Sequence, residues 1–311
     1  MTRPYIMRKG VSTLNDLVDG YSAIMAVAKN VYHVDQVHEN ASDSNNGDDP
    51  NKPLATIAKG YERCNTAGDT DVIFIKGADR YRENELVCEK DNVQFIGAGW
   101  GVQWNRTSSQ TGDYVLKVHG VGGVGLYNLH LSGQDLTEDV IYWGEGTTGD
   151  APSFGVIQNC LISAAWWTAT PAGTTKGLTL VSPTFMRIQD NFIYACGTGI
   201  DIQDGSEKTS HGLIIEHNKI CCGSYGIRWY AGYGYTSVIE DNTIWDWSST
   251  VNMTYGISLS LNTGGVLVTD NKIGCLAPAY DSGDTNYWVH NKIRNAEAES
   301  EAFAATIEDW C

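Results

Sequence analysis

The sequence has few positive charges and no long apolar run, and each absence restricts what the protein does. Its 21 Lys and Arg residues are outnumbered by 37 Asp and Glu residues, which gives a formal net charge of −16. No cluster of Lys or Arg is present, which disfavours nucleic acid, an anionic membrane or an acidic polysaccharide as a nonspecific partner. No run of about 18 apolar residues is present, so we expect no membrane-spanning helix.

The sequence also lacks a secretion signal and metal-binding cysteine pairs. Asp16 and Asp19 interrupt the stretch that would form the apolar core of a signal peptide. The eight cysteines have no C-x-x-C spacing and no intervening His ligands, so we expect no zinc site. Without a signal, buried free thiols are expected rather than disulfides. Cys311 is the exception, because the end of a chain is usually accessible.

A short phrase built on Asn recurs along the chain. It reads DNFI from position 190, HNKI from 217, DNTI from 241, DNKI from 270 and HNKI from 290. The positions three before and two after each Asn are large and apolar. The aligned residues are Asn159, Asn191, Asn218, Asn242, Asn271 and Asn291. Intervals of 20 to 32 residues between them are typical of a solenoid.

Within each repeat, apolar and polar residues alternate with a period of two, which indicates strands rather than helices. A second phrase that begins with Gly follows four of the corners, as GLTL from 177, GIDI from 199, GIRW from 226 and GISL from 256. Asn tolerates the left-handed backbone of a sharp corner, and stacked Asn amides form hydrogen-bonded ladders. The sequence therefore predicts an all-β fold, a parallel β-helix solenoid with a structural Asn ladder.

Upstream of the repeats, the sequence predicts a strand, a polar loop rich in Asp, Asn and Gly, and a helix at about 53–65 that begins with Pro53. Leu54, Ile57, Ala58 and Tyr61 make this helix amphipathic. The open end of a solenoid exposes strand edges and core. We therefore expect the helix to cap the N-terminal end.

The stretch 30–100 resembles the opening module of the right-handed parallel β-helix, or pectin-lyase-like, superfamily. The residues that carry the resemblance are DSNNGDDPNKPLATIAKGY, then DVIFIKGADRYREN, then VQFIGAG, and the DN-x-I corners are similar to that superfamily's repeat. The domain order expected with it is an N-terminal attachment arm at 1–30, a first strand, polar loop and capping helix at 31–70, a parallel β-helix at 71–295 and an acidic C-terminal arm at 296–311.

The resemblance implies where chemistry would occur, because enzymes of the superfamily act on polysaccharides along the outer face of one sheet. The outward positions of the Gly-phrase strand are Thr179, Asp201, Arg228 and Ser258. Asp201 and Arg228 fall on adjacent rungs. A base beside a calcium-binding carboxylate, as in the superfamily's lyases, is one interpretation, and a surface ion pair is the favoured one.

A second candidate lies in GIDIQDGSEKTSHG, which has a distant resemblance to polygalacturonases. By that likeness Asp201 and Asp204 would be the carboxylate acid and base of hydrolysis, with His211 in support. Ser210 stands where that pattern has Gly, and no downstream Arg-x-Lys follows. No catalytic set is therefore favoured.

Two groups of acidic residues raise the question of a metal. The residues before the corners are a mixture of Asp and His after Gln158, and the DSNNGDD loop at 43–49 suggests calcium by composition. The loop lacks the spacing and the final Glu of an EF-hand. Both groups are typical of solvated turns, so no cofactor is expected and calcium is the weaker alternative.

Aromatic residues are denser than a narrow solenoid core requires. Such residues form subunit interfaces or stack on sugar rings, and we favour the interface. The candidates are Trp229, Tyr230, Tyr233, Tyr235, Trp245 and Trp247.

The two ends and the missing catalytic set favour an assembly component. A β-helix with an extra N-terminal arm resembles virion proteins of phages and other viruses, such as capsid decorations, spikes and tail-associated proteins, which are often trimers. The resemblance implies a homotrimer in the virion, assembled in the host cytoplasm and attached to a capsid or tail protein through residues 1–30. Cys311 would then form an intersubunit disulfide. The alternatives are a polysaccharide lyase or glycoside hydrolase of the depolymerase kind, and a noncatalytic module that binds a host-surface glycan.

Overall fold

A computed structural model describes the solenoid body and leaves both ends of the chain undescribed. The described residues are 28–65, 69–77, 80–106, 109–133, 139–145, 151–164, 174–203, 205, 210–230, 233–247, 253–260, 263–275, 277–283 and 285–293. Most of the predicted N-terminal arm, the C-terminal arm, Asp204 and Cys311 lie outside them.

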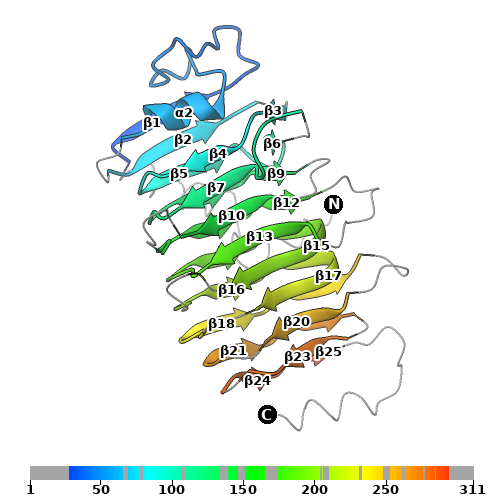
Figure 1. Cartoon of the computed structure of the whole chain (residues 1–311). Helices are drawn as coiled ribbons and strands as arrows, with labels where there is room; N and C mark the ends of the chain where they lie inside the picture. The colour runs from blue at the N-terminus through cyan, green and yellow to red at the C-terminus, as the bar shows by residue number, and fades with distance from the viewer. Residues whose placement is uncertain are drawn as a thin grey trace.

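Short parallel strands stack into a long sheet on one side of the molecule (Figure 1). Its ten strands follow chain order and skip the strands of the other side. They are β1 (Asn30–Val34), β2 (Asp71–Ile75), β5 (Val93–Gly97), β8 (Gly125–Tyr127), β11 (Val156–Gln158), β14 (Arg187–Gln189), β16 (Ile214–Glu216), β18 (Ser237–Glu240), β21 (Val266–Thr269) and β24 (Tyr287–Val289). Each coil of the chain therefore adds one rung.

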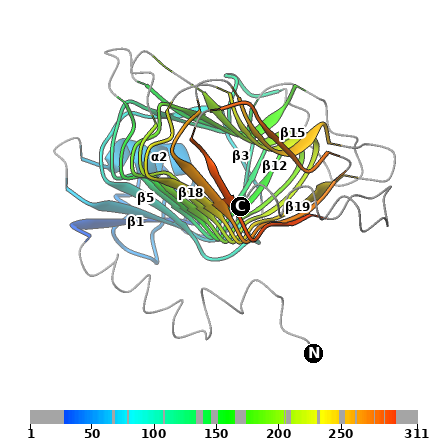
Figure 2. The same ribbon diagram turned by 90° about the horizontal axis from the view of Figure 1, so that it is seen from below.

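A second sheet has two rows of strands, which the long strands β15 (Phe192–Gln203) and β17 (Lys219–Trp229) join. The first row also contains β3 (Arg80–Arg82), β6 (Gln103–Asn105), β9 (His130–Ser132), β12 (Leu161–Ser163), β19 (Thr243–Asp246), β22 (Lys272–Gly274) and β25 (Lys292–Ile293). The second row contains β4 (Leu86–Cys88), β7 (Leu116–His119), β10 (Ile141–Gly144), β13 (Lys176–Val181), β20 (Tyr255–Leu259) and β23 (Ala279–Asp281). Figure 2 shows the coils end-on, wrapped around a common interior. The predicted parallel β-helix is confirmed.

The interior is a file of apolar side chains from successive rungs. Ile193, Ile220, Ile244 and Ile273 are in register on β15, β17, β19 and β22 and are at most 1% exposed. This is the alternation that the sequence predicts. Full burial of one such side chain stabilises the fold by about 1.5–3 kcal/mol.

The predicted alignment is wrong by one residue at Asn159. Asn159 is in register with Asp190, so that Cys160 occupies the place of Asn191. In the later coils the left-handed residue is the Asp or His that precedes the Asn, as at Asp190 (φ 57°) and His217 (φ 56°), whereas in this coil it is Asn159 itself (φ 53°). The buried apolar residues shift accordingly. They are Ile157 and Ile162 rather than Val156 and Leu161.

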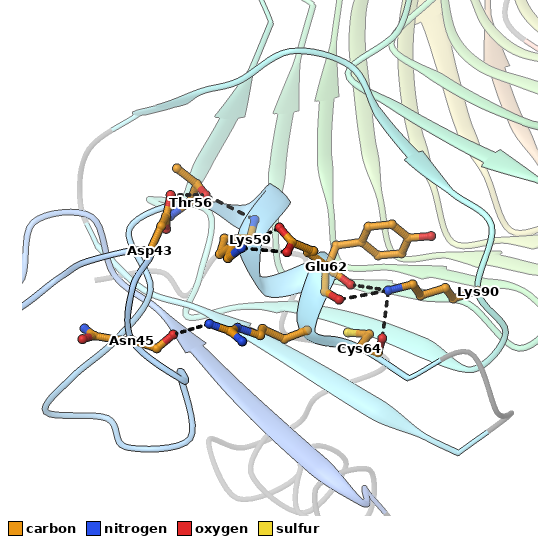
Figure 3. A network of polar contacts seen from close by, with 9 residues as sticks. Asp43, Asn45, Thr56, Lys59, Glu62, Cys64 and Lys90 are labelled. Carbon is orange, nitrogen blue, oxygen red and sulfur yellow. Dashed lines mark hydrogen bonds and ion pairs between the residues drawn. The ribbon is translucent and has the colours of Figure 1, made fainter.

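The helix α2 (Ile57–Arg63) is shorter than predicted, because polar side chains end it on both sides. Thr56 is the N-cap, with an extended backbone, and its hydroxyl accepts from the Lys59 N–H at 3.2 Å. Asp43 accepts from the backbone N–H of Thr56 at 3.0 Å (Figure 3). Glu83 accepts from the first helical N–H groups, those of Ile57 and Ala58, at 2.7 and 2.8 Å. Thus the polar loop positions the start of the helix.

Lys90 closes the other end of α2. Its ammonium group donates to the carbonyl oxygens of Tyr61, Glu62 and Cys64 at 2.9, 3.2 and 2.8 Å (Figure 3). A cation at the carbonyl end of a helix satisfies groups that have no partner in the helix and complements the helix dipole. Among the described residues, no helix reaches the length and hydropathy of a membrane span.

Candidate functional site

The outward side chains of the second row form the candidate site. Thr179, Asp201, Arg228 and Ser258 lie opposite one another on β13, β15, β17 and β20. They belong to consecutive rungs because the Gly phrase places each of them at the same point of its coil. Parallel strands bring such residues to within about 5 Å.

Asp201 is the centre of this group and is fully buried. Arg228 donates to both carboxylate oxygens, from Nε at 2.6 Å and from Nη2 at 2.9 Å. Gln203 donates to Oδ2 at 2.6 Å, and the Lys176 ammonium lies 3.1 Å from the same oxygen. Each carboxylate oxygen therefore already has at least one strong donor.

These contacts set the protonation state of the pair. Burial alone would raise the pKa of Asp201, but the hydrogen bonds from Arg228 and Gln203 and the charges of Arg228 and Lys176 outweigh it, so the pKa is lowered. The hydrogen bond to Asp201 raises the pKa of Arg228 in turn. Asp201 is thus an anion and Arg228 a cation at neutral pH.

Asp139, which the sequence analysis did not identify, extends the group. Its carboxylate lies 3.5 Å from the Lys176 ammonium and accepts a hydrogen bond from the Thr179 hydroxyl. Burial raises the pKa of Asp139. It lies two residues before β10, in a coil that lacks the Gly phrase, so the repeat offered no signal for it. Lys176 therefore lies between a carboxyl group with a raised pKa and one with a lowered pKa.

We name Asp139, Lys176, Thr179, Asp201 and Arg228 the charge network and consider its chemistry. A lyase needs a base, which requires a lowered pKa, and the pKa of Arg228 is raised. Hydrolysis needs two carboxyl groups that flank the substrate and a water. Here the Lys176 ammonium lies between the two carboxyl groups. The contacts therefore engage both oxygens of Asp201, and Arg228 is a cation rather than a base in this arrangement.

The structure does not bring His211 into the charge network. His211 pairs with Thr184 at a turn, and its ring stacks on Tyr235 at 5.8 Å. None of its described contacts is with Asp201. The polygalacturonase-like set is therefore not assembled among the described residues.

The candidate aromatic residues separate into a buried, a half-buried and an exposed group. Trp229 is fully buried, and its assignment to an interface or a sugar platform was wrong. It follows Arg228 on the strand, and alternation turns it inward. Trp245 and Trp247 are half-buried against a cluster that contains Tyr194 and Cys221.

Three tyrosines form the exposed group. Tyr230 is 63% exposed, and the Arg228 guanidinium lies 5.6 Å from its ring centre. Tyr233 and Tyr235 are each 48% exposed, and their rings stack at 5.2 Å. These three remain available to a partner.

The corner amides are hydrogen-bonded in file from Asn191 to Asn291. The amide nitrogen of each Asn donates to the side-chain oxygen of the next at 2.9–3.0 Å. Each nitrogen also donates to a backbone carbonyl, for example Asn242 to Ile215 at 2.9 Å. We keep the name Asn ladder for Asn191, Asn218, Asn242, Asn271 and Asn291. One coil earlier, Asn159 donates to Asn128 in the shifted register.

The polar turns and the cysteines show no ligand set in the described part of the chain. No three His, Cys, Asp or Glu side chains come together there as metal ligands. In the loop at 43–49, Asp43 and Asp49 accept hydrogen bonds from backbone N–H groups. The seven described cysteines are buried free thiols, and burial raises, for example, the pKa of Cys160 to about 12.

Comparison with known proteins supports the fold. The sequence pattern of the family described as "Right handed beta helix region" matches residues 100–293, more than half of the chain. Pectate lyase Pel9A is similar in structure, with a TM-score of 0.56 and 14% identity over 88% of this chain and 79% of that one. No curated protein matches the sequence.

Two further solved structures are similar to this chain. DFA-IIIase from Arthrobacter chlorophenolicus A6 matches with a TM-score of 0.56 and 12% identity over 84% of this chain and 68% of that one. XylC, in a complex with xylose, matches with a TM-score of 0.52 and 11% identity over 84% of this chain and 70% of that one. Identities this low establish the shared fold alone.

Proposed function

The chain belongs to the family of right-handed β-helix proteins, and from that premise we propose that it is a non-enzymatic structural protein of a virus particle. The proposal comprises a homotrimer attached to a capsid or tail protein through residues 1–30, with α2 as the cap of the solenoid. Its location in a virion rests on the resemblance to virion β-helix proteins given above.

The observation that supports a non-enzymatic role is the neutralised state of Asp201. On the sheet face where related enzymes would act, both oxygens of this carboxylate accept from Arg228, and Gln203 and Lys176 also contact Oδ2. A buried carboxylate held in this way would have to give up part of its ion pair with Arg228 before it could bind a calcium ion or accept a substrate proton. Its contribution is to the stability of the face.

The test is an activity screen with the full chain. Pectic, alginate and bacterial surface polysaccharides are incubated with the protein, with and without calcium, and new reducing ends and unsaturated products are measured. We expect none. Turnover that is lost in Asp201→Asn but kept in Glu240→Gln, a variant on the opposite sheet, would refute the proposal. Co-sedimentation of the tagged chain with purified virus particles tests its location.

A second candidate is a glycan-binding protein without turnover. Tyrosines accompany the charge network along the second row: the Arg228 guanidinium lies 5.1 Å from the Tyr225 ring centre, and the Tyr255 ring lies 6.2 Å from Tyr225 and 5.0 Å from Tyr280. Xylose in the XylC complex adds a carbohydrate precedent for the fold. Calorimetry with the same polysaccharides, on the wild type and on Tyr255→Ala, distinguishes this candidate, since it predicts binding without products.

A further inference from the structure

A row of aromatic rings lies at the turn that leads into the first sheet, and its ring contacts are separate from those of the charge network. The Phe154 and Phe185 rings stack at 5.4 Å, and Phe185 lies over Gly212, where an added Cβ would be 2.5 Å from the ring. The next residues of the row are His211, Tyr235 and Tyr233, stacked in turn at 5.8 and 5.2 Å. We name Phe154, Phe185, His211, Tyr233 and Tyr235 the aromatic strip. It follows consecutive coils along the solenoid axis.

The backbone under the two Phe residues is unfavourable. Phe154 and Phe185 have φ of 55° and 51°, in the left-handed region that bulky residues avoid. The same place in the neighbouring coils is occupied by Gly123 and Gly212, which adopt that region without steric conflict. Phe154 and Phe185 are nevertheless 64% and 53% exposed, so the monomer gains little apolar burial from the rings. The turn imposes this backbone on successive coils, as at Thr236 (φ 58°), so it is the large exposed rings placed on it that point to a contact outside the chain.

The strip has the wrong orientation for stacking on sugars. Its rings stack nearly parallel, with interplanar angles of 13° for Phe154 and Phe185 and 6° for Tyr233 and Tyr235. Each of these rings therefore has a neighbour over part of one face, which reduces the free face area. Sugar rings dock their C–H groups against aromatic faces, so the strip favours an apolar protein surface instead.

The charge and the area of the strip identify the partner as a second copy. Copies with a net charge of −16 repel one another. The strip contains no Asp, Glu, Lys or Arg, so a contact through it does not bring carboxylates of the two copies against each other. From the exposed fractions, its four most exposed rings offer roughly 400 Å². This is about half of what each partner buries in a stable interface. We propose that the aromatic strip is the centre of a lengthwise contact between copies of this chain. This inference rests on the homo-oligomer of the proposed function and specifies the surface through which its copies meet.

The experiment is sedimentation velocity of the full chain from about 1 to 100 µM. We expect the mass of the wild type to rise with concentration and the association of a Phe154→Gly, Phe185→Gly double variant to be at least tenfold weaker. The glycines restore the residue that Gly123 and Gly212 supply at this place, so the unfolding midpoint should stay the same or rise by a few degrees. Tyr287→Ser is the matched control, because Tyr287 is 62% exposed and lies outside the strip.

A second variant, Tyr233→Ser with Tyr235→Ser, keeps both Phe residues and should also weaken association. A wild type that stays monomeric throughout the range would overturn the inference. Glycine variants that associate as the wild type does would also overturn it, whatever their thermal stability. Either result leaves the polysaccharide screen untouched, and turnover in that screen would refute the non-enzymatic role without affecting the strip.

Discussion

Removal of one amide from the middle of the Asn ladder should be among the most destabilising single changes in this protein. Asn242 is fully buried, and its side chain takes part in four hydrogen bonds. Its oxygen accepts from the backbone and side-chain nitrogens of Asn218, both at 3.0 Å. Its nitrogen donates to Ile215 O and to the Asn271 side chain, both at 2.9 Å. Asn242→Ala removes all four.

The magnitude follows from the partners that remain. A neutral hydrogen bond contributes about 1 kcal/mol net, and a buried donor left without a partner costs more than that. Asn218 keeps two donors whose acceptor is gone. We therefore expect Asn242→Ala to lower the free energy of unfolding by about 4 kcal/mol and the midpoint of thermal unfolding by roughly 8 °C or more.

The assay is equilibrium unfolding in urea, followed by circular dichroism, with Asn40→Ala as the control. Asn40 makes one long side-chain bond, 3.4 Å to Asn51 O, at an exposed loop, so its loss should cost less than about 0.5 kcal/mol. If the two variants were equally stable within about 1 kcal/mol, the ladder would contribute little and the argument would fail.

Asn242→Asp adds a pH test of the same geometry. The aspartate oxygen that replaces the amide nitrogen would face two acceptors, Ile215 O and Asn271 Oδ1, so the folded state raises the pKa of the new carboxyl above its unfolded value of about 3.9. A raised carboxyl pKa costs stability above the unfolded pKa. The deficit of this variant relative to wild type should therefore grow as pH rises from about 4 towards neutrality. A deficit that does not change with pH would contradict the assigned donor.

Two further changes test the other polar groups. Asp201→Ala leaves Arg228 without its carboxylate and Lys176 with Asp139 alone, and it should cost about 3–5 kcal/mol at neutral pH. Because the folded pKa of Asp201 is lowered, this cost should shrink as pH falls below about 4. Urea unfolding measures the cost, and a cost that does not change with pH would contradict the ion pairs. Lys90→Met removes the three hydrogen bonds to the end of α2 and should lower the free energy of unfolding by about 1–2 kcal/mol, with amide exchange faster in Ile57–Arg63 than in the β-helix. Lys59→Met is the control, because it loses only the exposed ion pair with Glu62. Equal effects of the two variants would contradict the role of Lys90 at the end of the helix.

The sequence predicted the coils because their signal is local. A strand that alternates inward and outward residues beside a fixed corner can be recognised without knowing its neighbours, and Ile193, Ile220, Ile244 and Ile273 stack as expected. The register at Asn159 was wrong because Asn, Asp and His all adopt the left-handed conformation, so that the identity of the residue does not tell which of two adjacent positions forms the corner.

The charge network was predictable only in part. Asp201 and Arg228 share a phrase and therefore a position in the coil, which brings them together. Asp139 and Lys176 reach the same place through the lengths of their coils, and those lengths vary along the chain. Trp229 was assigned to the surface on composition, although the strict alternation after Arg228 directs it into the core.

The side-chain bonds of the Asn ladder all run one way, since the amide nitrogen of each Asn from Asn191 to Asn271 donates to the side-chain oxygen of the next Asn along the chain. A stretch of one repeat, such as the 24 residues from Asn218 up to Asn242, contains one ladder Asn, whose oxygen accepts from the preceding Asn and whose nitrogen donates to the following one. Duplicating that stretch in the gene should therefore lengthen the body by one rung, about 4.8 Å, without a mismatch at either splice. The length of the body is therefore set by the number of repeats and can be changed in steps of one rung.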